Sequence, residues 1–494
     1  MGRALDVEEI TIAAIHAAYR AETLTVRGLV QTYLDRIERF DQKGPAINAL
    51  ISLNPRALEE ADRLDVAFSA SGFVGPLHGI PIIIKDQGDV AEMPTTLGSI
   101  LFEGFMPGRD SFVVAKLKAA GAVFLGKATL GELGGGDTHG SLFGSTRNVY
   151  DLERTAGGSS GGSGASVSAN FCTVAIGQEG FASIRRPASW NGVAGMRPTA
   201  GLVSRSGVFG GWPAVTGSLG PMARTVTDLA VLLDCMVGYD PVDPITSHGA
   251  SVIPINAAQG LDKYALKGAR LGILREPMGT GSQPDSNDFA TVTRAFDSAV
   301  AELRAAGAEI VDPITIPDLK SLLATRAGDA DTGEAAFTEY FSGTANKPYA
   351  SRRELLVSPK AAKLPERTRK RLQRDSSVER HYAFLKARDL LMTRFLQVMA
   401  DNRLDAIVHK AVEHQPTLIK DGINPPYVDQ KGAPHLNTFL VYVPAIVVPA
   451  GFTDENQPTG ITFLGRPYQD AAMIRLAYAY EQATLHRRRP SGFS

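Results

Sequence analysis

Short apolar runs alternate with longer segments of helical spacing along most of this chain. Strand-like apolar runs lie at 80–84, 122–125, 173–176, 271–274, 405–408, 445–449 and 460–464. Helical spacing covers 7–40 and 55–70, and it returns between the runs at 111–120, 225–237 and 287–306. Because such an alternation builds a sheet with helices packed against it, the pattern predicts an α/β fold with a central mixed β-sheet covered by helices on both faces.

Two stretches depart from this alternation. Residues 315–400 are charged and helical in spacing, and they contain no strand-like run. The Gly- and Pro-rich stretch 415–435 is typical of a surface loop. Length alone allows two or three domains in 494 residues, and no internal repeat is apparent.

The composition, with 44% hydrophobic and 21% charged residues, is that of an ordinary soluble globular protein. A formal net charge of −1 offers no electrostatic basis for binding nucleic acid or an anionic membrane. No run approaches the ~20 apolar residues of a membrane span. The first residues carry acids early and lack the apolar core of a signal peptide. We therefore expect a cytoplasmic protein with neither a nucleic-acid nor a membrane partner.

Few residues suggest a disulfide, a metal site or a nucleotide site. Cys172 and Cys235 lie in apolar contexts, which favours buried thiols over a disulfide framework. His409 and His414 are five residues apart, not four as on a zinc-binding helix, and we expect them to be polar surface or mouth residues. The segment GAVFLGKA at 121–128 nearly matches a phosphate-binding loop, but Ala128 lacks the hydroxyl that would hold Mg²⁺. We expect no metal and no cofactor.

The strongest candidate chemistry lies in the glycine-rich stretch 155–198, which contains Ser159 and Ser183. Serine hydroxyls in such a frame can act as nucleophiles or proton relays when a base lies within hydrogen-bond reach. A candidate base is Lys85, which ends the apolar run 80–84. Each piece alone has a plainer interpretation: a flexible linker, a helix cap and a solvated strand end. Together they predict a serine hydrolase whose base is a lysine.

Six segments resemble, in order, those of the amidase signature family. They are GIPIIIKD (79–86), GAVFLGKATLGEL (121–133), TRNVYDLERTAGGSSGGSGA (146–165), 177–198, 220–233 and 460–484. The resemblance implies a single amidase domain over 1–494, with N-terminal helices over 1–70, the signature catalytic core over 75–240 and a variable helical substrate mouth over 315–400. It also implies a Ser–cis-Ser–Lys triad in which Ser183 is the nucleophile, Ser159 the cis-serine and Lys85 the base.

The segment before Ser183 departs from the family pattern. The family usually reads G-T-D-T/I-G-G-S, whereas this chain reads GQEGFAS over 177–183. The resemblance implies an oxyanion hole made by the backbone N–H groups of Gly180, Phe181, Ala182 and Ser183, and these donors survive if the backbone conformation does. A positive φ at Phe181 or Ala182 would be costly. We expect retained catalysis with an altered pocket.

The resemblance implies cleavage of a C–N bond in a small-molecule amide, anilide or carbamate through a serine acyl-enzyme. For Lys85 to be a base at neutral pH, its pKa must lie roughly 3 units below the ~10.4 of lysine in water. Two alternatives stay open: the glutamine-hydrolysing subunit of an amidotransferase, and a non-catalytic binding protein on the same scaffold. The segment 436–452 resembles the general family more than that subunit, which favours a free-standing enzyme, a monomer or homodimer.

Four aromatic residues near Ser183 bear on the substrate: Phe181, Trp190, Phe209 and Trp212. Each lies either in the core or in the pocket, and Phe181 stands where the family normally has glycine. A ring there would line the acyl side of the pocket and favour flat, apolar groups. We expect a preference for aryl or bulky apolar amides, of the aryl-acylamidase or urethanase type, over acetamide-sized substrates.

Overall fold

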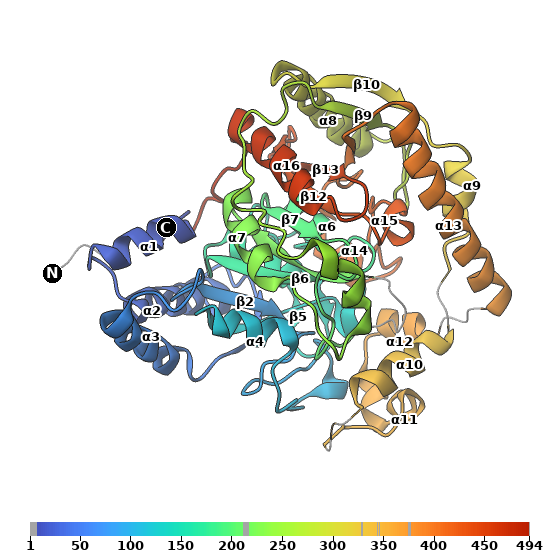
Figure 1. Cartoon of the computed structure of the whole chain (residues 1–494). Coiled ribbons are helices and arrows are strands. Elements are labelled where there is room, and N and C mark those ends of the chain that lie inside the picture. Colours follow the sequence, from blue (N-terminus) through green and yellow to red (C-terminus); the bar gives the residue numbers. More distant parts are fainter. Residues whose placement is uncertain are drawn as a thin grey trace.

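The computed structural model describes residues 7–210, 217–327, 330–342, 344, 346–373 and 377–493. Its centre is a mixed sheet of eleven strands in the order β1-β3-β2-β6-β8-β7-β12-β13-β11-β9-β10, within these ranges (Figure 1). The pairs β2–β3, β2–β6, β9–β10 and β9–β11 are parallel, and the others are antiparallel. The α/β fold with a mixed central sheet is confirmed.

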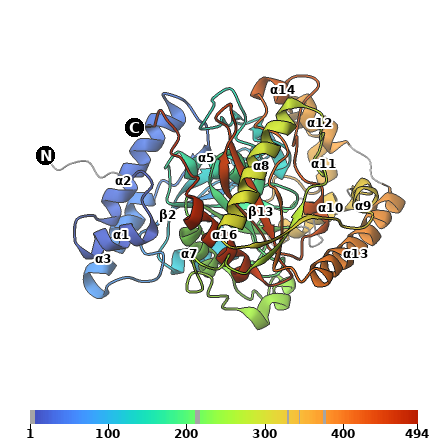
Figure 2. The same cartoon turned by 90° about the horizontal axis from the view of Figure 1, so that it is seen from above.

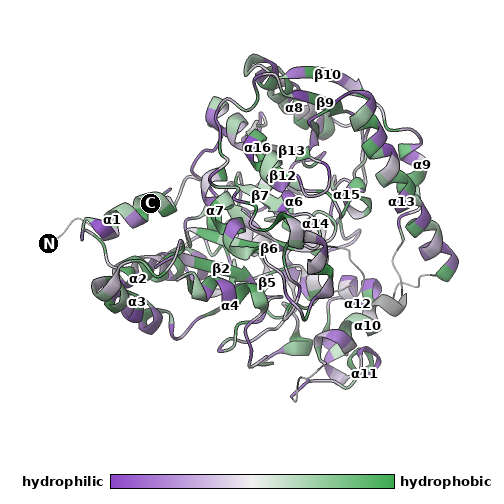
Figure 3. Ribbon diagram, in the orientation of Figure 1, coloured by the Kyte–Doolittle hydropathy of each residue, from purple (hydrophilic) through white to green (hydrophobic). Residues whose placement is uncertain are grey.

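The strands of this sheet are short, and most of the middle ones are buried along their whole length, although β12 is only partly buried at its last two residues. Their bounds are β1 Leu50–Leu53, β2 Pro81–Lys85, β3 Val123–Ala128, β6 Val174–Glu179, β7 Ala194–Arg197, β8 Ser218–Ala223, β9 Arg270–Leu274, β10 Glu309–Ile314, β11 Ala406–Lys410, β12 Ala445–Phe452 and β13 Pro458–Leu464. A separate small hairpin joins β4 His139–Gly140 and β5 Gly144–Ser145. All seven predicted apolar runs lie in strands. Figure 3 shows the hydrophobic colours gathered in these central strands.

Helices pack on this sheet and at its ends (Figure 2). Thr11 and Thr25 cap α1 and α2 by accepting a backbone N–H from the first turn, as N-cap threonines do. The helices are α1 Ile12–Arg20, α2 Val26–Ile37, α3 Ala57–Ser71, α4 Phe112–Ala119, α5 Gly161–Ser168, α6 Arg185–Trp190, α7 Val226–Met236, α8 Asn287–Ala305, α9 Leu319–Ala324, α10 Ala330–Tyr340, α11 Arg352–Val357, α12 Glu366–Leu372, α13 Val378–Asp401, α14 Ile419–Ile423, α15 Leu436–Phe439 and α16 Asp470–Thr484.

The region predicted to lack strands holds α9 to α13, which lie along one side of the molecule (Figure 1). Its described residues contain no strand. Of these helices, α9 and α13 pack in a buried cluster with residues of β9, β10 and β11. A cluster of buried side chains from α10, α11 and the segment 359–364 packs against Leu97, Leu101, Phe102 and Phe105. The helical region therefore covers the loops that follow β2.

Three expectations about individual segments need correction. His409 and His414 are both buried, because they lie on and just after β11 in the sheet, and Nδ1 of His414 lies 2.6 Å from the Asp288 carboxylate. Cys172 is a buried free thiol as expected, but Cys235 is a free thiol that is only half-buried. The stretch 415–435 is a surface loop only in its middle, since Gly432 and Ala433 are buried.

In the described part of the chain, every helix is too short or too polar to cross a membrane.

Candidate active site

Lys85 lies at the end of β2, in the interior of the sheet. Its strand is buried from Pro81 onward because β3 and β6 flank it on both sides, and the Lys85 side chain has no exposed surface. The Nζ atom donates to Ser159 Oγ at 2.7 Å and to the carbonyl oxygen of Gln178 at 3.3 Å. These two acceptors are neutral oxygens, so the hydrogen bonds of the amine do not require a positive charge.

Burial lowers the pKa of Lys85 well below its ordinary value, and the nearby Glu179 carboxylate only partly opposes this. A second lysine shows the contrast. Lys127 on the adjacent strand β3 is equally buried, but its Nζ lies 3.0 Å from the Asp86 carboxylate and donates to Thr95. A buried amine without an ion pair favours the neutral form, which can accept a proton.

Ser159 sits in a glycine turn that leaves no room for side chains. The Gly158–Ser159 peptide bond is cis. A Cβ on Gly158 would lie 2.3 Å from the carbonyl oxygen of Gly136, so only glycine fits there. The Ser159 carbonyl accepts the N–H of Gly131 at 3.0 Å, which connects this turn to the end of β3. The packing explains why the segment is so rich in glycine.

Residues 180–184 join β6 to α6, and we call them the nucleophile loop after the role predicted for Ser183. The Glu179 carboxylate accepts the backbone N–H groups of Ile184 and Arg185, both at 2.9 Å, and thus spans the loop from one end to the other. Arg185 Nε donates to the same carboxylate at 2.8 Å. Burial raises the pKa of Glu179, but the guanidinium groups of Arg185 and Arg197 outweigh it and hold this pKa below its ordinary value.

Ser183 is almost fully buried within this loop. Its carbonyl oxygen accepts the N–H of Ser160 at 3.1 Å, so the turn that holds Ser159 and the nucleophile loop are directly bonded. The structure therefore brings Lys85, Ser159 and the Ser183 segment together from β2, the start of α5 and the start of α6. Lys85 lies 74 residues before Ser159 in the sequence, and α5 contacts both β2 and α6.

The backbone of the nucleophile loop tolerates its unusual side chains. The residues with positive φ in the described chain include neither Phe181 nor Ala182, so a Cβ at these positions is not strained. Within that same part of the chain, no residue accepts a hydrogen bond from the N–H groups of Gly180, Phe181, Ala182 or Ser183. Buried N–H groups normally have partners, so these donors can bind a negatively charged oxygen of a ligand.

The four aromatic residues near Ser183 fall into different places. The Phe181 ring packs with Ala182 and Ala433, and the Arg326 guanidinium lies over it at 3.9 Å from the ring centroid. Trp190 lies in the main core, where its Nε1 donates to the His414 carbonyl. Of the two placements that the sequence left open, core or pocket, Trp190 therefore has the core one. Phe209 packs in the cluster under α10, with its ring centroid 5.1 Å from that of Tyr340. Trp212 lies outside the described residues.

Sequence reasoning missed several residues of this site. Gln178 supplies a carbonyl to Lys85, Arg185 and Arg197 pair with Glu179, and Arg326 covers Phe181. The IRRP run directly after Ser183 was a usable signal, because two adjacent arginines in an apolar segment need carboxylate partners. Arg326 carried no such signal, since it lies in the charged helical region. Among the described residues, no group of three or more His, Cys, Asp or Glu side chains could hold a metal ion.

Comparisons with known proteins find relatives over nearly the whole chain. The family model described as Amidase matches residues 28–474. One subunit of the glutamyl-tRNA(Gln) amidotransferase of Thermosynechococcus vestitus is 31% identical, over 97% of this chain and 99% of its own. The X-ray structure of the native peptide amidase of Stenotrophomonas maltophilia has a TM-score of 0.85 at 31% identity, covering 98% of both chains. A bacterial aryl acylamidase has a TM-score of 0.78 over 97% of both chains, and at 24% identity this likeness shows the fold alone.

Proposed function

The chain belongs to the amidase signature family of hydrolases, and we propose that Lys85, Ser159 and Ser183 are the catalytic triad with which it cleaves amide C–N bonds. The observation that carries the proposal is the buried hydrogen bond of 2.7 Å between Lys85 Nζ and Ser159 Oγ. A lysine that burial drives toward its neutral form can take a proton from this hydroxyl.

The proposed reaction follows from this arrangement. Ser159 takes the proton of Ser183 and passes its own to Lys85 as Ser183 Oγ attacks the amide carbonyl. The N–H groups of residues 180–183 stabilise the negative charge on the carbonyl oxygen. The proton returns through Ser159 to the departing nitrogen, which leaves as an amine. Water then hydrolyses the acyl-enzyme by the same relay and releases the acid.

We further propose that the substrate is an amide, anilide or carbamate with an aryl or bulky apolar acyl group. Phe181 supports this, because it lies two residues before Ser183 in the chain and its nearly buried ring packs with Ala433, under the Arg326 guanidinium and against His435. We infer that this ring is held rigidly and lines the acyl side of the pocket. Burial of a matching group against such a ring contributes roughly 1–3 kcal/mol.

A second candidate is the glutamine-hydrolysing subunit of an amidotransferase. The 31% identity to one subunit of glutamyl-tRNA(Gln) amidotransferase favours it, because that relative covers nearly the whole chain. The two candidates share the same triad and differ in substrate and in their need for partner subunits. Hydrolysis of glutamine that appears only with added partner subunits would support the second candidate.

Single substitutions of the triad test the proposal. We expect Ser183→Ala to abolish turnover of an anilide, and Lys85→Ala and Ser159→Ala to lower kcat by several orders of magnitude. A Ser159→Ala/Ser183→Ala double variant should lose little more than Ser183→Ala alone, since the residues act as one unit. Ser163→Ala is the matched control and should keep near-normal turnover, because Ser163 lies in the same glycine-rich segment but its hydroxyl donates to the Ile176 carbonyl. Near-normal kcat in Ser183→Ala would show that the triad is assigned incorrectly.

A graded series of acyl groups tests the proposed preference. Phe181→Gly should move the optimum of kcat/KM along the series while leaving turnover of the smallest anilide intact. An unchanged profile across the series would mean that the Phe181 ring does not contact the acyl group.

A further inference from the structure

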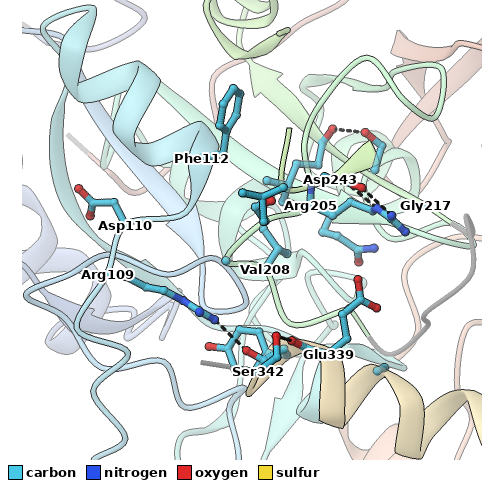
Figure 4. Close-up of a pocket in the computed structure, with 18 residues that line it drawn as sticks. Arg109, Asp110, Phe112, Arg205, Val208, Gly217, Asp243, Glu339 and Ser342 are labelled. Carbon is cyan, nitrogen blue, oxygen red and sulfur yellow. Dashed lines mark hydrogen bonds and ion pairs between the residues drawn. The ribbon is translucent and has the colours of Figure 1, made fainter. Parts of the chain in front are cut away.

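A cavity of about 350 Å³ lies beside the nucleophile loop and is distinct from the Phe181 cluster. Its walls come from six segments of the chain: the start of α4 with the residues just before it, the end of β6, the loop after β7, the start of β8, the segment after α7 and the last turns of α10 (Figure 4). The charged and polar side chains that matter below are Arg109, Asp110, Gln178, Arg205, Asp243 and Glu339. None of them belongs to the proposed triad.

The cavity shares one wall with the candidate active site. Gln178 lines the cavity, while its backbone carbonyl accepts the Lys85 amine. Gly217 also lines it, and a Cβ there would lie 2.4 Å from the Glu179 carbonyl, so the wall is one backbone thick. The Gln178 side chain is nearly buried, and its Oε1 accepts no hydrogen bond from any residue that the structure describes. A buried amide oxygen without a partner is costly unless a ligand donates to it.

The charges in the wall are paired with one exception. Arg205 binds Asp243 through two bonds of 2.7 and 3.0 Å, and Arg109 binds Asp89 and the carbonyl of Tyr340. Asp110 accepts from Lys118 at 3.0 Å. Glu339 alone has a carboxylate for which the described residues offer no hydrogen bond and no ion pair. With the partners Asp89 and Lys118 included, four carboxylates stand against three cationic groups, which leaves one negative charge, at the exposed residue Glu339.

The Glu339 carboxylate does not stabilise α10. It lies in the last turn of α10, where the helix dipole disfavours a carboxylate, and that turn contains no basic residue. Figure 4 shows its side chain pointing from α10 into the cavity toward Arg205. Burial lowers the pKa of Arg205, but bonds to Asp243, and then the charge of Glu339, raise it above its ordinary value. Glu339 therefore faces the cavity and acts electrostatically across it.

We propose that this cavity is a subsite for a cationic substituent of the substrate, an ammonium or guanidinium group, bound by Glu339 with Gln178 Oε1 as a second acceptor. The proposal rests on the amide-hydrolase function proposed above and adds to it a substrate class. An anionic substituent fits less well, because both guanidinium groups already have carboxylate partners. The cavity and the Phe181 cluster share no residue, so the cationic subsite is separate from the proposed acyl wall.

Two matched substrate series test the proposal. The members of the first series are amides of benzoic acid with hexylamine or with amines of equal length. The far end of the amine chain is a methyl group, an ammonium or a carboxylate. The members of the second series are anilides of heptanoic acid or of acids of similar length. The far end of the acid chain is a methyl group, an ammonium or a carboxylate. We expect the ammonium member of one series to exceed its neutral partner in kcat/KM by about tenfold, the worth of a hydrogen bond to a charged group.

Variants of Glu339 test whether this residue causes the preference for the ammonium member. Glu339→Gln should abolish the advantage of the ammonium member while leaving kcat/KM of the neutral member within about twofold, and Glu339→Lys should transfer the advantage to the carboxylate member. Glu22→Gln, which removes an exposed carboxylate from the loop after α1, is the control for net charge. A preference for ammonium that persists in Glu339→Gln, or no preference in the native protein, would overturn the subsite. Hydrolysis of the neutral members separately reports on the amide-hydrolase function.

Discussion

Two buried lysines one strand apart show how pairing decides chemistry at the scale of single residues. Lys85 and Lys127 are both fully buried, and both point into polar surroundings. Lys127 has a carboxylate within 3.0 Å, and Lys85 has a hydroxyl and a carbonyl. The environment of Lys85 favours a neutral amine. In the sequence both lysines follow apolar residues. The sequence does not show which lysine has a carboxylate partner, because Asp86 and Thr95, the partners of Lys127, lie closer to Lys85 along the chain.

The lowered pKa of Lys85 predicts the pH dependence of turnover. The neutral amine forms as pH rises through this lowered pKa, so kcat/KM should rise with a slope of one and then stay level into the alkaline range. His409 and His435 cannot produce this rise near neutral pH, because burial lowers their pKa values to about 3 and about 4. The pH–rate profile on a neutral anilide measures the effect. A bell-shaped profile that falls on the alkaline side below about pH 9 would contradict a neutral-lysine base.

The same shift has a consequence for stability. In the unfolded chain Lys85 binds its proton up to the ordinary pKa, whereas in the folded protein it releases the proton at a lower pH. Between the two values the unfolded state holds more protons, so the free energy of unfolding rises with pH across that interval. Lys85→Met should flatten this rise, which urea denaturation at several pH values would measure.

At the residue scale, what the sequence could predict depended on whether a residue's neighbours lie close along the chain. The three proposed triad residues stand out because glycines and apolar runs surround them locally. The surroundings of His414 and Trp190 come from elements more than a hundred residues away, such as α8, and those of His409 come from the neighbouring strands β9 and β13. Burial of this kind leaves no local pattern, and the expectation that the two histidines lie at the surface was therefore wrong.

At the scale of elements, the connection from β6 to α6 explains why a carboxylate follows Gln178. Glu179 lies at the end of a strand, and its side chain reaches forward to the first N–H groups of α6, where the helix dipole favours an anion. The two buried arginines, Arg185 and Arg197, supply its counter-charge. The longer side chain, compared with the usual aspartate, still spans the loop. The loop geometry thus depends on one buried charge.

Neutralising that charge should destabilise the fold strongly. Glu179→Gln leaves Arg185 and Arg197 buried without their carboxylate, and breaking a buried pair costs about 3–5 kcal/mol in the free energy of unfolding. Asp62→Asn is the matched control, because Asp62 pairs with Arg27 on the exposed surface and its loss should cost less than about 1 kcal/mol. Urea denaturation measures both. Equal, small losses in the two variants would show that Glu179 does not hold the loop.

The predicted strands were those whose apolar runs are continuous, because strands buried on both faces have no polar positions to interrupt them. β7 and β8 were missed because their sequences, AGMR and SLGPMA, contain glycine and proline, which are rare within strands. β10 was missed because it is an edge strand with exposed polar residues. The helices with clear apolar spacing, including α4, α7 and α8, lie where they were predicted, to within one or two residues.

At the scale of the whole molecule, the helical region is joined to the loop that follows Lys85. Tyr340, at the end of α10, donates its hydroxyl to the buried carboxylate of Asp89 at 2.5 Å. Arg109 bonds the same carboxylate at 3.1 Å and donates to the Tyr340 carbonyl at 2.8 Å. Asp89 lies four residues after Lys85, so α10 is held directly beside the segment that follows β2. No sequence pattern could predict a contact across 251 positions.

Removing this hydroxyl should loosen α10 and spare the triad. Tyr340→Phe keeps the ring, which packs on Phe209 and Phe341, but takes a donor from a buried carboxylate, and such bonds contribute about 1–3 kcal/mol. We expect a lower free energy of unfolding by that amount, faster limited proteolysis within α10, and a rise in KM that exceeds any fall in kcat, because α10 lines the cavity while Lys85 keeps its partners. Tyr382→Phe, on an exposed tyrosine of α13, is the control and should change stability by less than about 0.5 kcal/mol. Proteolysis and KM in Tyr340→Phe that match this control would mean that the helical region and the catalytic core act independently.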